Sequence, residues 1–244
     1  QDLAAHADPD LRRTVMQVLF HSLQAEAAVL GNETPADFGT LRQTFLSVLS
    51  GDADSSLRGE AAWGLGQWLT AAPGDSHVQK TLADALLERS FEAADEPSRF
   101  RSRAGLKQAD LGPEQLSRIA AAASAPGGSF EVRSWALELL GAKSEDLSGP
   151  QKLLIVGATA EADPKLREIA VSQLLGLKDL AEAGAAARAA LADPVWNVRF
   201  AAVASVAGLE GTAAREKLTS IAGSDPSEEV REAARRALAA LGKP

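Results

Sequence analysis

The sequence predicts an all-α fold built as a solenoid, in which similar helix pairs stack one on the next. The first observation is a segment near the end, residues 225–238 (DPSEEVREAARRAL), which recurs in weaker form at residues 193–206, 163–174 and 8–19. The second is that the copies keep one internal spacing of apolar residues, and the third is the absence of runs typical of strands. A repeat of this kind indicates units that pack on their neighbours.

An arginine marks each copy and serves as position zero of the repeat. Positions −1, +3 and +7 are apolar in every copy except at Gln108, and this spacing places them on one face of an α-helix. The last five arginines follow one another at intervals of 32, 34, 32 and 32 residues, whereas the first two intervals are 46 and 43. The seven arginines are Arg12, Arg58, Arg101, Arg133, Arg167, Arg199 and Arg231.

Each motif also carries a signal for the start of a helix. An Asp-Pro pair precedes the arginine in four copies, and we expect the aspartate to cap the helix while the proline occupies its first position. The capping carboxylate would also suit the positive end of the helix dipole. The four aspartates are Asp8, Asp163, Asp193 and Asp225.

The apolar pattern predicts thirteen helices, a leading helix at residues 9–30 and six pairs. Residues 1–96 hold longer, irregular repeats and residues 97–244 hold compact ones, within a single repeat domain spanning residues 1–244. The first helix of each pair is expected at residues 35–49, 78–89, 113–123, 150–160, 180–191 and 212–222. The second is expected at residues 55–70, 98–109, 130–141, 164–177, 195–209 and 228–241.

The motif D-P-x-x-x-V-R-x-x-A-x-x-A-L resembles HEAT repeats, in particular the short bacterial form first described in phycobilin lyases. The resemblance covers nearly the whole chain and implies a right-handed, armadillo-like superhelix. It places the motif on the second (B) helix of each pair, with the B helices lining the concave side. It also implies a polar ladder between repeats, formed by the seven arginines and the four aspartates above.

Composition limits the classes of partner. The formal net charge of −8 disfavours nucleic acid and anionic membranes, which both reward a basic face. There is no cysteine and no run of 18 apolar residues, so we expect neither a thiolate metal site nor a membrane span. The chain begins at Gln1, which fits a cytoplasmic protein or one exported after loss of an N-terminal segment, and leaves the compartment open.

No motif in the sequence predicts catalysis, a metal or a cofactor. His6, His21 and His77 lack the His-Glu dipeptides that metal-binding hydroxylases of this family carry, so we interpret them as structural. The Gly64-Leu65-Gly66 segment is too short for a dinucleotide fingerprint and lies within a predicted helix. The seven arginines could be taken for a phosphate-binding stripe, but their place in the motif favours the ladder.

Large rings outside the apolar stripe are the candidate binding residues. Trp63, Trp68, Trp135 and Phe200 occupy positions +5, +10, +2 and +1, and Trp196 occupies position −3. In a chain with 5% aromatic residues, such rings are candidates for partner anchors. The alternative is that contacts with the first helix of each pair bury them.

The sequence therefore predicts a non-catalytic scaffold or adaptor that holds a protein or peptide on its concave B-helix surface. One alternative is a bilin lyase-like or chaperone-like subunit that handles a chromophore and its apoprotein. Another is a DNA glycosylase with HEAT-like repeats, which the negative charge disfavours.

Overall fold

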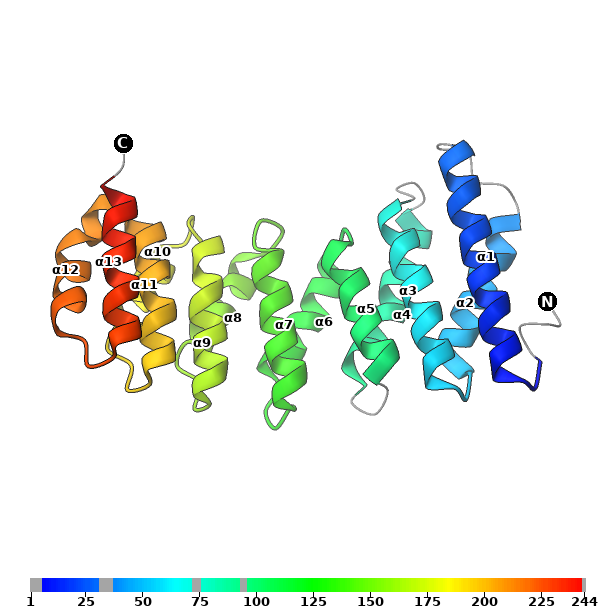
Figure 1. Cartoon of the computed structure of the whole chain (residues 1–244), viewed down its shortest axis with the longest axis horizontal. Helices are drawn as coiled ribbons and strands as arrows, with labels where there is room; N and C mark the ends of the chain where they lie inside the picture. The colour runs from blue at the N-terminus through cyan, green and yellow to red at the C-terminus, as the bar shows by residue number, and fades with distance from the viewer. Residues whose placement is uncertain (1–5, 31–36, 72–75, 93–95, 243–244) are drawn as a thin grey trace. The chain divides into compact units, whose positions relative to one another are not determined.

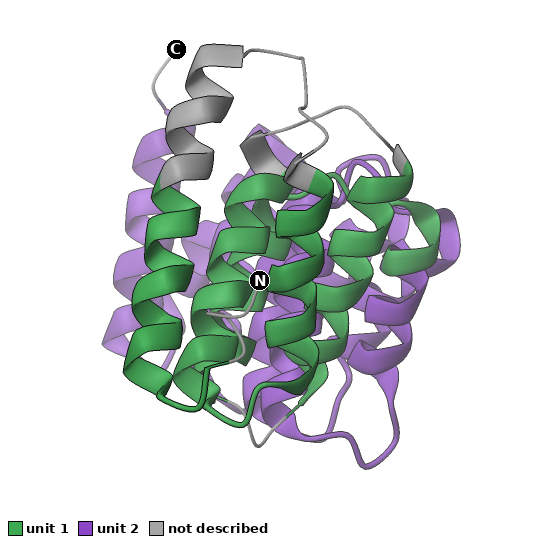
Figure 2. Ribbon diagram, turned by 90° about the vertical axis from the view of Figure 1, so that its right-hand side faces the viewer, with its two compact units in different colours: residues 1–115 green, residues 116–244 purple. Residues whose placement is uncertain are grey.

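The computed structural model describes residues 6–30, 37–71, 76–92 and 96–242. Within these residues the chain forms thirteen α-helices and two short 3-10 helices, and it contains no strand (Figure 1). This confirms the predicted all-α repeat fold. The chain divides into two compact units, residues 1–115 and residues 116–244 (Figure 2). The single repeat domain expected from the sequence stays a prediction.

Unit 1 contains five helices and the start of a sixth. The helices are α1 (Pro9–Leu30), α2 (Asp37–Gly51), α3 (Ser55–Ala71), α4 (Ser76–Phe91) and α5 (Glu96–Gln108). The next helix, α6 (Pro113–Ser124), begins in unit 1 and continues into unit 2. Contacts join α1 to α3 and α3 to α5, so these three helices form one layer, the B layer of unit 1.

Unit 2 continues the alternation with shorter loops. Its helices are α7 (Phe130–Ala142), α8 (Gly149–Ala158), α9 (Pro164–Gln173), α10 (Ala181–Ala190), α11 (Trp196–Glu210), α12 (Arg215–Ser224) and α13 (Glu228–Leu241). The 3-10 helix η2 (Leu174–Gly176) lies inside the α-helix expected at residues 164–177, and η3 (Gly211–Ala214) overlaps the start of the one expected at residues 212–222. Helices α7, α9, α11 and α13 contact one another in turn and form the B layer of unit 2, nearer the viewer in Figure 1.

The predicted apolar stripe forms the core of the compact repeats. In α11, Val198, Ala202 and Val206 at positions −1, +3 and +7 are completely buried. The same positions of the α9 repeat are occupied by Leu166 and Ala170 of α9 and by Leu174, the first residue of η2, and all three are buried. The small alanine in the middle of each stripe lets neighbouring helices pack closely.

The predicted register of the third motif copy was wrong by two residues. The arginine is the fourth residue of every other B helix, and in α5 the fourth residue is Arg99, not Arg101. Counting from Arg99 places the buried Ser98, Ser102 and Leu106 at −1, +3 and +7. Phe100, expected in the stripe, is 73% exposed. Two core positions of α5 hold serine instead of an apolar residue, which concealed the true register.

The predicted caps are correct for two of the four aspartates. Helix α1 begins directly after Asp8, and Asp163 caps α9 by accepting a hydrogen bond from the Lys165 N–H. Asp193 and Asp225 lie two residues before the caps of α11 and α13, which are Val195 and Ser227. These two carboxylates instead accept hydrogen bonds from arginines of the preceding repeats. The longer Asp-to-Arg spacing in these two copies is the sequence signal that distinguishes them.

Candidate functional site

The polar ladder is built from arginines that bridge successive B helices. Arg199 donates from Nε and Nη2 to the two carboxylate oxygens of Asp225, at 2.8 and 2.9 Å. Its Nη1 donates to the backbone carbonyl of Asp193, six residues earlier, at 2.8 Å. The two charged side chains are only 10% and 3% exposed. One guanidinium therefore fixes its own helix start and the start of the next B helix.

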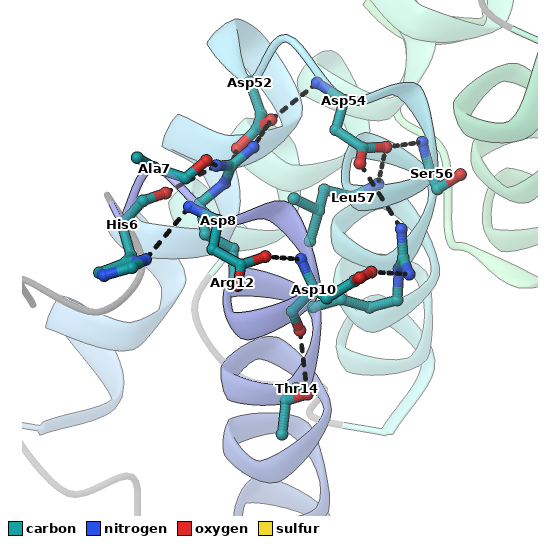
Figure 3. A network of polar contacts seen from close by, with 11 residues as sticks. His6, Ala7, Asp8, Asp10, Arg12, Thr14, Asp52, Asp54, Ser56 and Leu57 are labelled. Atoms are coloured by element: carbon teal, nitrogen blue, oxygen red, sulfur yellow. Dashed lines mark hydrogen bonds and ion pairs between the residues drawn. The ribbon is translucent and has the colours of Figure 1, made fainter.

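The same arrangement recurs at other repeats. Arg167 donates to both carboxylate oxygens of Asp193 at 2.7 and 3.0 Å, and to the carbonyl of Glu161. In unit 1, Arg12 donates to both oxygens of Asp52 at 3.0 and 2.9 Å (Figure 3). Each such carboxylate also accepts from the N–H two residues on, so it is satisfied on several sides.

A single position of the repeat supplies the partner carboxylate. Asp52, Glu161, Asp193 and Asp225 each lie six residues before the next arginine, and they pair with the arginine of the preceding copy. Asp8 and Asp163 lie four residues before their arginines. They make capping bonds to the N–H groups of Asp10 and Lys165. Asp52 and Glu161 were missed from the sequence because they are not followed by proline.

Arg101 and Arg231 of the predicted ladder pair with carboxylates at other positions, whereas Arg58 keeps the ladder's bond to the backbone carbonyl six residues earlier. Arg101, outside the register, pairs with Glu60 of α3 at 2.8 Å. Arg58 donates to the backbone carbonyl of Asp52. Arg231, in the final helix, pairs with Glu228 of its own first turn and with the carbonyl of Asp225. The copy that follows α5 has Gly127 at position −6, so this position offers no carboxylate to an arginine of α5.

The electrostatics of the ladder stabilise the charged forms. The hydrogen bond from Arg199 lowers the pKa of Asp225 below its ordinary value, against the opposing effect of burial. Burial alone would raise the pKa of Asp193, but the hydrogen bonds from Arg167 and the Val195 N–H together with nearby guanidinium charge lower it. These arginines are engaged by protein groups, so the structure gives them a positioning role and does not present them to a ligand.

The aromatic pair on α11 is the candidate binding site. Trp196 is 45% exposed and Phe200 is 47% exposed, although both rings are large and apolar. They lie one helical turn apart, and their ring centroids are 6.4 Å apart in an edge-to-face arrangement. Such a pair offers rigid apolar area that only a further binding partner would bury.

The other predicted anchors are less accessible. Trp63 is 38% exposed, and its ring lies 4.2 Å from that of the buried Phe20. Trp68 is half-buried, with the guanidinium of Arg42 at 5.5 Å from its ring. Trp135 is also half-buried. Of the five predicted rings, Trp63 and Trp68 belong to unit 1 and the other three to unit 2.

Phe130 is an exposed ring that the sequence analysis missed. It is the first residue of α7, it is 42% exposed, and it lies at position −3 as Trp196 does. The ammonium group of Lys165 on α9 lies 5.9 Å from its ring centroid. Comparing the same position across copies would have found it.

Phe130, Trp196 and Phe200 belong to a surface that we call the B face. It comprises positions −3, −2, +1 and +5 of the three consecutive B helices α7, α9 and α11. Its residues are Phe130, Glu131, Ser134 and Glu138, then Pro164, Lys165, Glu168 and Ser172, then Trp196, Asn197, Phe200 and Ala204. The Lys165–Phe130 contact and a 3.4 Å hydrogen bond from Asn197 to Glu168 connect the three helices across this face.

No cluster of histidine, aspartate and glutamate able to hold a metal ion is found in the described part of the chain. His6 accepts a hydrogen bond from the Asp8 N–H, and the His21 ring lies edge-on to Phe20 at 5.9 Å. In the same ranges, no helix is long and apolar enough to cross a bilayer.

Comparison with protein families matches residues 151–239, from α8 to α13, to a model of HEAT repeats. This part of the chain is therefore similar to HEAT repeats. The HEAT segment includes α9 and α11 of the B face, and the arginine position recurs in α1, α3, α5 and α7 outside it. The match agrees with the family predicted from the sequence, and it covers the residues where the motif is most regular.

Two solved structures of engineered proteins are similar to the chain. The first is 17% identical and has a TM-score of 0.44, with 82% of this chain and 96% of that chain covered. The second is 15% identical and has a TM-score of 0.40, with 98% of this chain and 77% of that chain covered. A comparison with curated proteins finds no match.

Proposed function

We propose that the chain is a non-catalytic binding scaffold that holds a protein or peptide on the B face. HEAT repeats provide a repeat-type scaffold in general, since their helices present a continuous layer of side chains. The observation that carries the proposal is the exposed Trp196–Phe200 pair, which lies off the buried stripe of α11.

The ladder supports this function indirectly. Arg167 and Arg199 fix the starts of α9, α11 and α13 relative to one another through Asp193 and Asp225. A surface made of side chains from several helices keeps its spacing only if those helices keep their register. Preorganisation of this kind lowers the entropic cost of binding.

The proposal is tested by affinity capture from a lysate of the source organism. The full chain is immobilised as wild type, as the double variant Trp196→Ala/Phe200→Ala, and as Leu153→Ala. Leu153 is 47% exposed on α8, outside the B layer, so its truncation is a matched loss of apolar surface. We expect proteins retained by wild type and by Leu153→Ala to be lost with the double variant. Identical retention by all three would contradict the proposal.

A further inference from the structure

The charged residues of the B face have one predominant sign. Glu131, Glu138 and Glu168 contribute carboxylates, and Lys165 contributes the single basic side chain among its twelve residues. Lys165 already lies against the Phe130 ring. Glu138 is exposed and, in the described residues, has no ion-pair partner. The carboxylates therefore outnumber the cations beside the three exposed rings.

Glu168 connects the acidic and aromatic parts of this surface. It lies on α9 at position +1, the position that Phe200 occupies on α11. Its Oε2 accepts a hydrogen bond from Asn197 Nδ2 at 3.4 Å, and Asn197 directly follows Trp196. This long, neutral contact leaves the charge of Glu168 uncompensated next to the aromatic pair.

The adjacent helix α13 does not share this character. Its Glu228 forms ion pairs with Arg231 and Arg235 of the same helix. Its Glu232 forms ion pairs with Arg235 at 3.0 Å and with Arg236 at 2.9 Å. The carboxylate that borders the rings of α11 is thus Glu168 of α9, the helix that packs directly beside α11.

We propose that the partner of the B face is a basic peptide segment, one that combines lysine or arginine with apolar side chains. This inference rests on the proposed function and specifies its ligand. Apolar side chains of the segment would cover Trp196 and Phe200. A lysine or arginine would reach Glu168 and lie over an aromatic face, where a cation is attracted by the ring quadrupole. An acidic segment or a nucleic acid would meet the same carboxylates with like charge.

The test is selection of a phage-displayed library of random twelve-residue peptides on the intact chain. Peptides that bind wild type but not Trp196→Ala/Phe200→Ala are sequenced, and their lysine and arginine content is compared with that of the unselected library. We expect at least a twofold enrichment of these residues. Ring-dependent peptides without enrichment would overturn the basic-partner inference and leave the proposed function intact. Absence of any ring-dependent peptide would overturn both.

A charge-matched pair of variants then examines Glu168 directly. The probe is the most frequent ring-dependent peptide, labelled with fluorescein and followed by anisotropy at low and at high salt. Glu168→Gln should weaken binding about fivefold at low salt, and less at high salt because screening already reduces the attraction. Glu216→Gln on α12 removes the same charge outside the B layer and should leave affinity unchanged. Equal affinity of the two variants would overturn the role of Glu168.

Discussion

Arg199 binds both carboxylate oxygens of Asp225, 26 positions later in the chain, in a geometry that leaves the aspartate side chain only 3% exposed. Breaking a buried pair by removing one partner leaves the other charge uncompensated. We therefore expect Arg199→Ala to lower the free energy of unfolding by about 3 kcal/mol, measured by chemical denaturation. Arg236→Ala, which removes a 78% exposed side chain in an ion pair, is the control and should change it by at most about 0.5 kcal/mol. Equal effects would contradict the positioning role of Arg199.

The stabilisation from this pair should depend on pH. The pKa of Asp225 is lowered in the folded chain, chiefly by the hydrogen bond from Arg199, so the unfolded chain binds a proton more readily. The contribution is thus complete above the carboxyl's ordinary value of 3.8 and is lost as the pH falls through the lower folded value. The stability difference between wild type and Arg199→Ala should shrink in that acidic range. A difference that stayed constant between pH 7 and pH 2.5 would contradict this assignment.

Ser102 gives a test of the corrected register of α5. Its hydroxyl is fully buried and has no hydrogen-bond partner, at a position where the other B helices carry alanine or valine. Ser102→Ala removes an unsatisfied buried polar group and should raise the free energy of unfolding by about 1 kcal/mol.

The control for Ser102 is Ser172→Ala on α9, whose hydroxyl is exposed and bonds to the Glu168 carbonyl. Both substitutions raise helix propensity, by about 0.5 kcal/mol each. The stabilisation by Ser102→Ala should therefore exceed that by Ser172→Ala. A smaller gain at Ser102 would mean that its hydroxyl has a partner in solution.

A glycine contact sets the distance between α3 and α5. A Cβ added at Gly105 would lie 2.7 Å from the Cα of Gly66, so backbone would have to move. Gly105→Ala should destabilise unit 1 by about 1–3 kcal/mol through overpacking. Gly157 on α8 has nothing within 4 Å of such a Cβ, and Gly157→Ala should stabilise by about 0.5–1 kcal/mol. Thermal melting of both variants distinguishes steric contact from a general effect of glycine replacement.

The apolar periodicity was sufficient to predict the helices, but it gave the wrong register where polar residues occupy core positions. The stripe of α11 followed from Val198, Ala202 and Val206, since only apolar residues can fill a dry core. In α5 the serines at positions −1 and +3 hid that stripe, and the more apolar Phe100 drew the register to Arg101. Gln108, the one polar residue at a position predicted to be apolar, was the signal that this register was wrong.

The candidate site was only partly predictable for a different reason. Exposure of a ring depends on what neighbouring helices place over it, and helical position alone does not determine that. Trp63 and Trp196 both lie outside the apolar stripe. Phe20 from the neighbouring helix α1 packs against Trp63, whereas the ring contact of Trp196 is an edge-to-face one with Phe200 of its own helix. The partner carboxylates of the ladder were predictable in principle, because all four lie six residues before the next arginine.

The most direct test of the central claim is acrylamide quenching of a chain in which Trp196 is the only tryptophan, with Trp63, Trp68 and Trp135 replaced by phenylalanine. We expect strong quenching of Trp196 in the free chain and clear protection when a ring-dependent peptide is added. Trp196 fluorescence that is already shielded in the free chain, or unchanged by the bound peptide, would contradict the role of the exposed Trp196 ring as a binding anchor.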